Sequence, residues 1–396
     1  MLLTLYLEIN NFNYIFSVRD EDGQNNFKTI YNLNVRLDGI TDNRISDLNK
    51  VYDIIKENIY IIEKNFKYTF KEIVIILDNF NTSYLNFSGN KKLNGSQILR
   101  ENITYILNNL KSCVSEIELK KNILHIFNSK FYLDKKKIDN LPIGLFGDLY
   151  SHELSFALID SSDIKNLDYI LDKCNVKIKK IIIKSFLKGA LISNNYQNTD
   201  TFFYIQINDN NSKIFYYEND SLKSEQNFKF GTDIIIRDVA KITSLKLDTV
   251  KKILNKMNLS NEKFSDNDYL EKEFFINESY RKIKKKLVFE IAQARLAEIF
   301  EIMLLKNINY TYYSQISKKV FIESNSKYQI KFLDEVCRKI LFDNGGFSID
   351  FVHYETSDNL LSTADKIVHF GWKKEAIPIS VPKKSLIAKV FEAIFG

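Results

Sequence analysis

The order of apolar and polar residues predicts two similar halves in this chain. Residues 3–18 read as a strand, a polar turn at Asn10 and Asn11, and a second strand, and residues 27–37 read as a third strand. Residues 201–230 repeat this order, with three apolar strands separated by short polar turns. Alternation with a period of two is typical of strands that bury one face. Two halves that open in the same way predict a duplicated α/β fold with a cleft between the halves.

A period near 3.6 residues predicts helices between these strands. The clearest helix has an apolar face made of Leu48, Val51, Ile55, Ile59 and Ile62. β-Branched residues predict a buried strand at 72–77. Further helices are expected at 96–113, 165–173, 233–242, 247–257, 282–305 and 332–341, and further strands at 122–137 (two short strands), 152–160, 177–186, 319–323 and 348–353.

The segment 383–396, KKSLIAKVFEAIFG, predicts an amphipathic helix that follows a proline break at Pro382. Its membrane-facing residues would be two leading lysines and one broad apolar face, namely Lys383, Lys384, Leu386, Ile387, Val390, Phe391, Ile394 and Phe395. Ser385, Lys389 and Glu392 fall on the opposite face. A short amphipathic helix led by lysines is typical of an interfacial membrane anchor. The alternative is a helix that docks on the protein's own core.

The composition is that of an ordinary globular protein and narrows the function only slightly. Of the 396 residues, 45% are hydrophobic and 27% are charged, which is enough core for two or three domains. The net charge of +6 suits approach to an anionic membrane surface. It gives no indication of nucleic-acid binding, so we expect no nucleic-acid partner.

Cysteine spacing and hydropathy exclude several classes of protein. Cys113, Cys174 and Cys337 are far apart and have no histidine at ligand spacing, which argues for a reducing compartment and against a zinc site or a disulfide framework. We therefore expect no metal site of the cysteine–histidine kind. The first residues alternate like a strand, so we expect no signal peptide. Membrane contact is expected from segment 383–396 alone, because no stretch approaches 18 apolar residues.

Several stretches, taken in order, resemble FtsA, the bacterial actin-like family that ties the FtsZ ring to the membrane. The most specific one runs from ILHIFNSKFYLD to LPIGLFGDLYSHELSFALID, and it carries His125, Phe131, Tyr132, Leu133, Asp134, Pro142, Gly144 and Gly147 in the order of the family pattern. FKFGTDIIIRDVAKI is similar to a family helix start, with Gly231 and Asp238 kept. The amphipathic segment resembles the membrane-targeting helix of the family.

The resemblance implies an α/β, actin-like fold, as in actin, Hsp70 and sugar kinases. This fold is two-lobed and duplicated, with a 1C insertion subdomain and a C-terminal amphipathic helix. The expected divisions are subdomain IA at 1–80 and 162–198 with 360–379, subdomain 1C at 81–161, subdomain IIA at 199–242 and 310–359, subdomain IIB at 243–309, and the linker and helix at 380–396.

The resemblance also implies a site for ATP with Mg²⁺ between the lobes. Matching positions would be Glu8, Asn10 and Asn11 in the first phosphate turn, Asp209 and Asn210 in the second, Gly231 beside it, and Arg295, Glu298, Ser324 and Ser326 on the adenosine side. The glycines of all three signatures are missing. Either asparagine, which tolerates left-handed backbone, replaces glycine and leaves a weak ATP site, or the fold persists as a scaffold without nucleotide.

The function that the resemblance implies is cell division rather than catalysis, so we expect no enzyme. The protein would link the FtsZ ring to the cytoplasmic face of the bacterial inner membrane at the septum. Expected partners are the FtsZ C-terminal peptide, other division proteins, membrane lipid, and further copies of the chain in an actin-like polymer. Two alternatives remain, namely a type IV pilus scaffold of the PilM kind and an actin-fold ATP-dependent enzyme, which would need intact phosphate loops.

Overall fold

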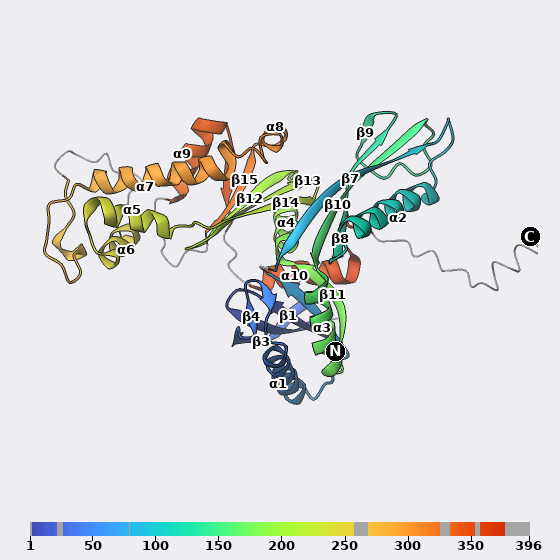
Figure 1. Cartoon of the computed structure of the whole chain (residues 1–396), viewed down its shortest axis with the longest axis horizontal. Helices are drawn as coiled ribbons and strands as arrows, with labels where there is room; N and C mark the ends of the chain where they lie inside the picture. Colours follow the sequence, from blue (N-terminus) through green and yellow to red (C-terminus); the bar gives the residue numbers. More distant parts are fainter. Residues whose placement is uncertain are drawn as a thin grey trace, which may run out of the picture.

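The structure is a computed structural model of the whole chain, and it describes residues 2–21, 27–78, 80–256, 268–324, 333–352 and 357–376. The predictions made for Ser326 and for segment 383–396 lie outside the described residues. The described strands form three large sheets and one small hairpin, β4 (Ile40–Thr41) with β5 (Arg44–Ile45). Figure 1 shows the two lobes and the sheet that is inserted into the first lobe.

The first lobe is built on a five-stranded sheet, called here the first-lobe sheet. In spatial order it contains β11 (Lys177–Ile183), β6 (Glu72–Leu77), β1 (Leu2–Ile9), β2 (Asn13–Glu21) and β3 (Phe27–Arg36). β1 is parallel to β6 and antiparallel to β2, and β6 is parallel to β11. The predicted strand–turn–strand opening is confirmed, with the polar turn between β1 and β2.

The second lobe repeats this arrangement in the second-lobe sheet. Its spatial order is β16 (Ser348–Phe351), β15 (Lys319–Ser324), β12 (Phe202–Ile207), β13 (Ser212–Glu218) and β14 (Ser221–Phe228). β12 is parallel to β15 and antiparallel to β13, as β1 is to β6 and β2. The two sheets therefore have the same order and directions, and the predicted duplication is confirmed.

A third sheet, called here the insertion sheet, lies between β6 and β11 in the sequence. It contains β7 (Thr82–Lys92), β10 (Leu149–Asp160), β8 (Lys121–Leu133) and β9 (Lys136–Ile138), all antiparallel. The prediction of two short strands at 122–137 was wrong, because β8 is a single 13-residue strand followed by the short β9. Bulges where β8 pairs with β10 interrupt the alternation that would mark one long strand.

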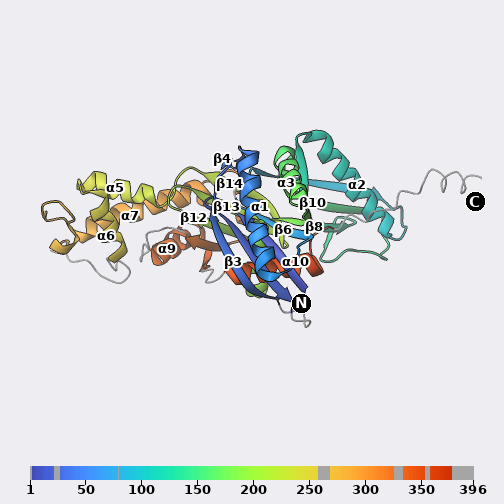
Figure 2. The same cartoon turned by 90° about the horizontal axis from the view of Figure 1, so that it is seen from below.

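Helices cover the outer faces of both lobe sheets. In the first lobe these are α1 (Leu48–Phe66) and α3 (Ser161–Lys173), and Figure 2 shows α1 crossing the sheet. In the second lobe they are α5 (Asp233–Thr243), α6 (Leu247–Lys256), α7 (Lys285–Phe300) and α9 (Leu333–Gly345). The remaining helical segments outside the centre are α2 (Arg100–Ile117) on the insertion sheet, η1 (Lys272–Phe274), η2 (Glu301–Leu305) and α8 (Tyr313–Ile316).

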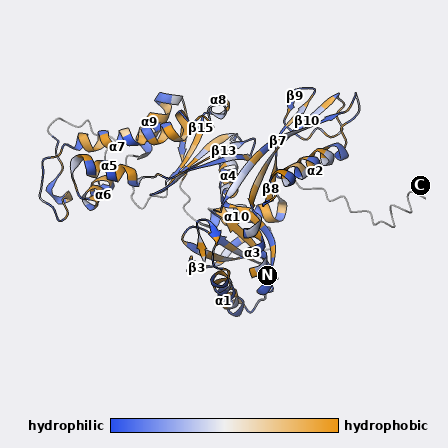
Figure 3. Ribbon diagram, in the orientation of Figure 1, coloured by the Kyte–Doolittle hydropathy of each residue, from blue (hydrophilic) through white to orange (hydrophobic). Residues whose placement is uncertain are grey.

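Helix α1 shows why the periodic helices were predictable. Val51, Ile55, Ile59 and Ile62 are buried on one face, as predicted. The side chain of Asp47 accepts a hydrogen bond from the backbone N–H of Lys50 and caps the first turn. In Figure 3 several outer helices show both orange and blue residues, which fits helices with one buried face.

Two further helices lie between the lobe sheets and were not predicted. They are α4 (Lys184–Asn195) and α10 (Ser357–Phe370), and their core joins residues of both sheets. The strand predicted at 177–186 ends at Ile183, where α4 begins. Residues 185–192 of α4 are buried all round, so no apolar stripe marks the helix in the sequence.

Gly189 sets how closely α4 approaches the second-lobe sheet. A Cβ atom at this position would lie 2.1 Å from the ring of Tyr217 on β13. The hydroxyl of Tyr217 donates a hydrogen bond to the backbone oxygen of Ser185 at 2.6 Å. The ring thus lies directly on the helix backbone, and glycine is required by this contact.

Candidate functional site

The ends of the parallel strands meet in a cleft between the lobes. Glu8 lies near the carboxyl end of β1, and Asp78 follows β6. In the second lobe, Gln206 of β12 and Glu323 of β15 are register partners near the same end of their strands. Helix α4 begins between these strand ends. In open α/β sheets such a position is the usual ligand site, so we treat this cleft as the candidate functional site.

Lys184, the first residue of α4, pairs with two carboxylates of the first lobe. Its Nζ lies 2.7 Å from Oε1 of Glu8 and 3.2 Å from Oδ2 of Asp78. Burial opposes the charge on the Lys184 ammonium, but Asp78 and Glu8 outweigh it and raise the pKa of this lysine above its ordinary value. Burial likewise acts against the Asp78 carboxylate, yet Lys184 with Lys213 and Lys188 lowers the pKa of Asp78. The cleft therefore contains charges that are compensated within the chain.

Lys188, one turn further along α4, pairs with the second lobe. Its Nζ lies 2.6 Å from Oε2 of Glu323, and both side chains are buried. The hydroxyl of Tyr204 donates a hydrogen bond to the same carboxylate oxygen. The two lysines, four residues apart, thus attach α4 to the strand ends of both lobes.

The first predicted phosphate turn is closed by its own side chain. Oδ1 of Asn10 accepts hydrogen bonds from the backbone N–H groups of Phe12 and Asn13, each at 2.9 Å. Its Nδ2 donates to Oε1 of Glu8 at 3.2 Å. Neither Asn10 nor Asn11 has a positive φ angle. Asparagine therefore does not stand in for a left-handed glycine here, and N–H groups that a phosphate could use are already bonded.

The second predicted turn is held against the start of α5. The backbone N–H groups of Thr232 and Asp233 donate to the backbone oxygens of Asn208 and Asp209, at 3.0 and 2.9 Å. A Cβ atom on Gly231 would lie 2.1 Å from the oxygen of Asn208, so this close approach requires glycine. The turn supplies carbonyl oxygens where an anion-binding helix start offers free N–H groups. Asp209 and Asn210 also have no positive φ.

The residues predicted on the adenosine side connect two helices of the second lobe. Arg295 of α7 forms an ion pair with Asp238 of α5, and its NH1 lies 2.5 Å from the carboxylate of Glu298. Ser324 is the exposed last residue of β15.

The structure thus brings Glu8 together with Asn10, Asp209 with the Gly231 region, and Arg295 with Glu298. Their assignment to a nucleotide stays a prediction, as do the subdomain boundaries.

A small cavity lies in the cleft beside Lys184 and Lys188. It has a volume of about 20 Å³ and is lined by Asp78, Lys184, Lys188, Gln206, Lys213 and Glu225, among others. Such a volume holds about one water molecule. Sites for small molecules measure roughly 300–1,000 Å³. Among the residues that the structure describes, no group of three or more His, Cys, Asp or Glu side chains is arranged to hold a metal ion. The cavity beside Lys184 and Lys188 is therefore too small for ATP in this arrangement.

Sequence reasoning missed the lysines that fill the cleft. Lys184 and Lys188 are the two cations in the mainly apolar stretch IIIKSFLKGALI. Their spacing of four residues puts them on one face of a helix. Lysine is almost never fully buried unless it is paired. Two lysines at helical spacing in an apolar run were therefore an available signal for a buried ionic site.

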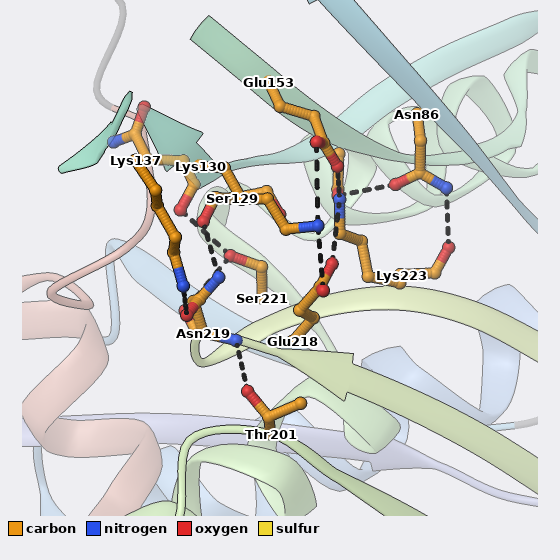
Figure 4. Close-up of polar contacts among 12 residues, drawn as sticks. Asn86, Ser129, Lys130, Lys137, Glu153, Thr201, Glu218, Asn219, Ser221 and Lys223 are labelled. Carbon is orange, nitrogen blue, oxygen red and sulfur yellow. Dashed lines mark hydrogen bonds and ion pairs between the residues drawn. The ribbon is translucent and has the colours of Figure 1, made fainter. Parts of the chain in front are cut away.

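The insertion sheet also contacts the second lobe through buried charges, drawn in Figure 4. Nζ of Lys130 on β8 lies 2.9 Å from Oε1 of Glu218 on β13, and Lys223 on β14 forms an ion pair with Glu153 on β10. Burial lowers the pKa of Lys223 despite these carboxylates. Asn219 donates to the backbone oxygen of Ser129 at 3.1 Å. The two lobes are thus joined on this side as well.

The repeated five-strand order, the two helices between the sheets and the cleft at the strand ends define the class of this protein. It has the actin-like, two-lobed fold, which confirms the fold predicted from the sequence. The solved structure of the PilM–PilN type IV pilus biogenesis complex has a chain that matches with a TM-score of 0.50 at 9% identity, over 93% of this chain and 96% of that chain. MreB5 of Spiroplasma citri bound to ADP matches with a TM-score of 0.44 at 9% identity, over 92% of this chain and 95% of that chain.

In sequence the chain is similar to the cell division protein FtsA of Buchnera aphidicola subsp. Acyrthosiphon pisum, with 20% identity over 215 residues. The match spans 54% of this chain and 51% of that protein, so it covers about half of the relative's length. No protein-family model matches the sequence. Together with the fold, this match supports a divergent FtsA-like protein with an actin-like fold. None of the described helices is long and apolar enough to cross a bilayer.

Proposed function

We propose that this chain is a cell-division adaptor that holds an FtsZ polymer at the cytoplasmic face of the bacterial inner membrane, at the septum. The likeness to FtsA supports the division role, and the amphipathic pattern of 383–396 supports attachment to lipid. The actin-like body would serve as a rigid, non-catalytic scaffold. Its arrangement would be independent of nucleotide, because the cleft charges are already paired within the chain.

The proposal rests on how the residues directly before segment 377–396 are held by the rest of the protein. The segment 372–376, called here the strap, is bonded to both lobes. The backbone N–H of Ala376 donates to Ile126 of β8 at 2.7 Å, and the indole N–H of Trp372 donates to the backbone oxygen of Asp220 at 3.1 Å. A tether that starts from both lobes would transmit membrane attachment to the whole body.

A partly buried carboxylate strengthens the strap. Oε1 of Glu375 lies 2.9 Å from Nδ1 of His125, and Oε2 lies 2.7 Å from Nζ of Lys180. Burial alone would raise the pKa of Glu375, but His125 and Lys180 outweigh it and lower this pKa to about 2. The Glu375 carboxylate therefore stays ionised throughout the neutral range.

A single amphipathic segment would bind lipid only weakly. Each large apolar side chain offers roughly 1.5–3 kcal/mol when fully buried, whereas ordering the backbone costs on the order of 1 kcal/mol per residue. Several copies on one polymer would gain avidity of about 10²–10⁴. The weak lipid binding of one segment and the avidity of several together support self-association as part of the proposed function.

Vesicle flotation of the full chain tests the membrane claim. Phe391→Glu combined with Ile394→Glu puts two charges on the apolar face and is expected to release the protein from vesicles of phosphatidylcholine and phosphatidylglycerol. Ser385→Glu combined with Gly396→Glu adds the same two charges on the opposite face and should retain binding. Equal flotation of both double variants would contradict the proposed anchor.

Binding of a labelled FtsZ C-terminal peptide tests the partner. By resemblance, the contact lies in residues 243–309, and fluorescence anisotropy with the full chain should report saturable binding. The likeness in fold to the PilM chain favours one other candidate, a scaffold for a peptide from a pilus membrane protein. No FtsZ-peptide binding, together with retained lipid binding, would favour that alternative.

A further inference from the structure

The free end of the insertion sheet carries an exposed apolar surface that the adaptor proposal does not use. We call it the apolar tip, and it consists of Leu99, Leu141, Ile143, Leu145 and Phe146. These side chains are 41–69% exposed, with Phe146 the most exposed of them. Single exposed apolar residues are normal on proteins, but five on two adjoining segments mark an interaction surface.

The backbone holds the two segments of the tip together. The N–H of Ile98 donates to Leu145 at 2.8 Å, and the N–H of Gly144 donates back to Ile98 at 2.9 Å. Gly144 has a φ of 89°, which favours glycine. Gly147 lies so close to Leu133 that an added Cβ would come within 2.3 Å of that side chain. The tip is therefore an ordered surface fixed to the end of β8.

Basic and acidic residues both border this surface, and several of the basic ones are lysines. Lys92, Arg100, Lys135 and Lys136 are exposed around the ends of the same strands and helix. The carboxylate of Asp134 accepts hydrogen bonds from the backbone N–H groups of Asp148 and Leu149, each at 2.8 Å. Glu101, Asp139 and Asp148 are also exposed near these segments. Apolar side chains with lysines and an arginine close by suit the interface of an anionic bilayer.

The strap brings the proposed anchor within reach of the same side of the molecule. Ala376 is bonded to Ile126 of β8, and the strand rises about 23 Å from there to Leu133 beside the tip. Residues 377–382 span at most about 20 Å when extended. The proposed anchor would therefore begin within about 20 Å of Ala376, which is bonded to the insertion sheet. Figure 1 shows the free end of the insertion sheet, around β9, projecting away from the first lobe.

We propose that the apolar tip is a second membrane-contact surface, which binds an anionic bilayer together with segment 383–396. This inference rests on the proposed membrane attachment. Two contacts on one body would fix the orientation of the actin-like body on the membrane, which a single tether leaves open. The second contact would also raise the effective concentration of each apolar face at the bilayer.

The test uses the full chain and vesicles of phosphatidylcholine and phosphatidylglycerol. Ile143→Ser combined with Phe146→Ser is expected to weaken vesicle binding about tenfold or more, because two large apolar groups no longer enter the interface. Ile117→Ser combined with Leu119→Ser removes two apolar groups that are even more exposed, at the opposite end of α2, and should leave binding unchanged. Urea midpoints of both variants should equal that of the parent chain, because the substituted side chains are exposed.

A second measurement locates the tip directly. The Phe146→Trp variant should give emission that brominated phosphatidylcholine quenches, beyond the quenching of Trp372 in the parent chain. The proposal is overturned if the Ile143→Ser, Phe146→Ser variant binds vesicles as the parent chain does and the Phe146→Trp variant shows no added quenching. In that case, release of the Phe391→Glu, Ile394→Glu variant from vesicles would still support the proposed anchor. A change in sedimentation mass of the Ile143→Ser, Phe146→Ser variant in the absence of lipid would identify a second copy of the chain as the occupant and also overturn it.

Discussion

Nζ of Lys188 lies 2.6 Å from Oε2 of Glu323 and joins the helix between the sheets to the second lobe. Removing one partner of a buried pair leaves the other charge uncompensated. Lys188→Met is therefore expected to lower the free energy of unfolding by about 3 kcal/mol, measured by urea denaturation. Lys339→Met, at an exposed position of α9, should change it by less than about 0.5 kcal/mol.

The double variant checks the cause of this loss. Lys188→Met combined with Glu323→Gln removes both charges, so it should be more stable than Lys188→Met alone, although the variants share one site. A Lys188→Met chain as stable as the parent would show that the pair does not hold the lobes together.

Gly189→Ala tests the contact between α4 and β13. Alanine favours a helix over glycine by about 1 kcal/mol, but here its Cβ would lie 2.1 Å from the Tyr217 ring. Overpacking of this kind costs about 1–3 kcal/mol, so we expect a net loss of stability in thermal denaturation. Tyr217→Leu should relieve much of the added cost in the double variant. A stabilised Gly189→Ala chain would contradict the close approach.

His152 predicts a pH dependence of stability. Burial between β7 and β8 lowers its pKa from 6.5 to about 4, and its ring contacts those of Phe131 and Tyr150. The folded state thus keeps the ring neutral where the unfolded chain protonates it. Its contribution is fully present above pH 6.5 and is lost as the pH falls from 6.5 to 4.

Replacement of this ring isolates its share of the acid sensitivity. His152→Phe should flatten the fall in unfolding free energy between pH 6.5 and 4, relative to the parent chain measured in parallel. Carboxylates titrate in both proteins, so the difference between the two curves belongs to this position. Identical slopes would mean that His152 is protonated in the folded state as readily as in the unfolded chain.

Calorimetry of the full chain with ATP and Mg²⁺ tests the cleft. We expect no binding heat and no rise in unfolding temperature, because Lys184 and Lys188 are paired and the cavity holds about one water molecule. A dissociation constant near 1 μM would stabilise the chain by about 4 kcal/mol at 1 mM ATP. A shift of that size would mean that the cleft opens to admit a nucleotide and that its ion pairs exchange partners.

The sequence alone determined the duplicated strands and the outer helices. Helix α1 buries only one face, so its apolar residues, such as Val51 and Ile55, recur at helical spacing. This spacing can be read directly from the sequence. The absence of glycine from the turn at Asn10 was equally visible. Helices α4 and α10 were not predicted from the sequence. Residues 185–192 of α4 are buried on every side, so that helix has no apolar stripe to mark it in the sequence.

Only the tertiary structure decided the state of the cleft. Lys184 and its partner Glu8 are 176 residues apart, and Lys188 and Glu323 are 135 apart. Such pairs form because the parallel strands of both lobes end at one cleft and α4 begins there. The spacing of residues along the chain does not show which distant residues come into contact. The sequence could therefore show that the phosphate-turn glycines are missing, but not that two lysines fill the site. The physical reason is that burial and charge compensation depend on distances in space, which the fold alone sets.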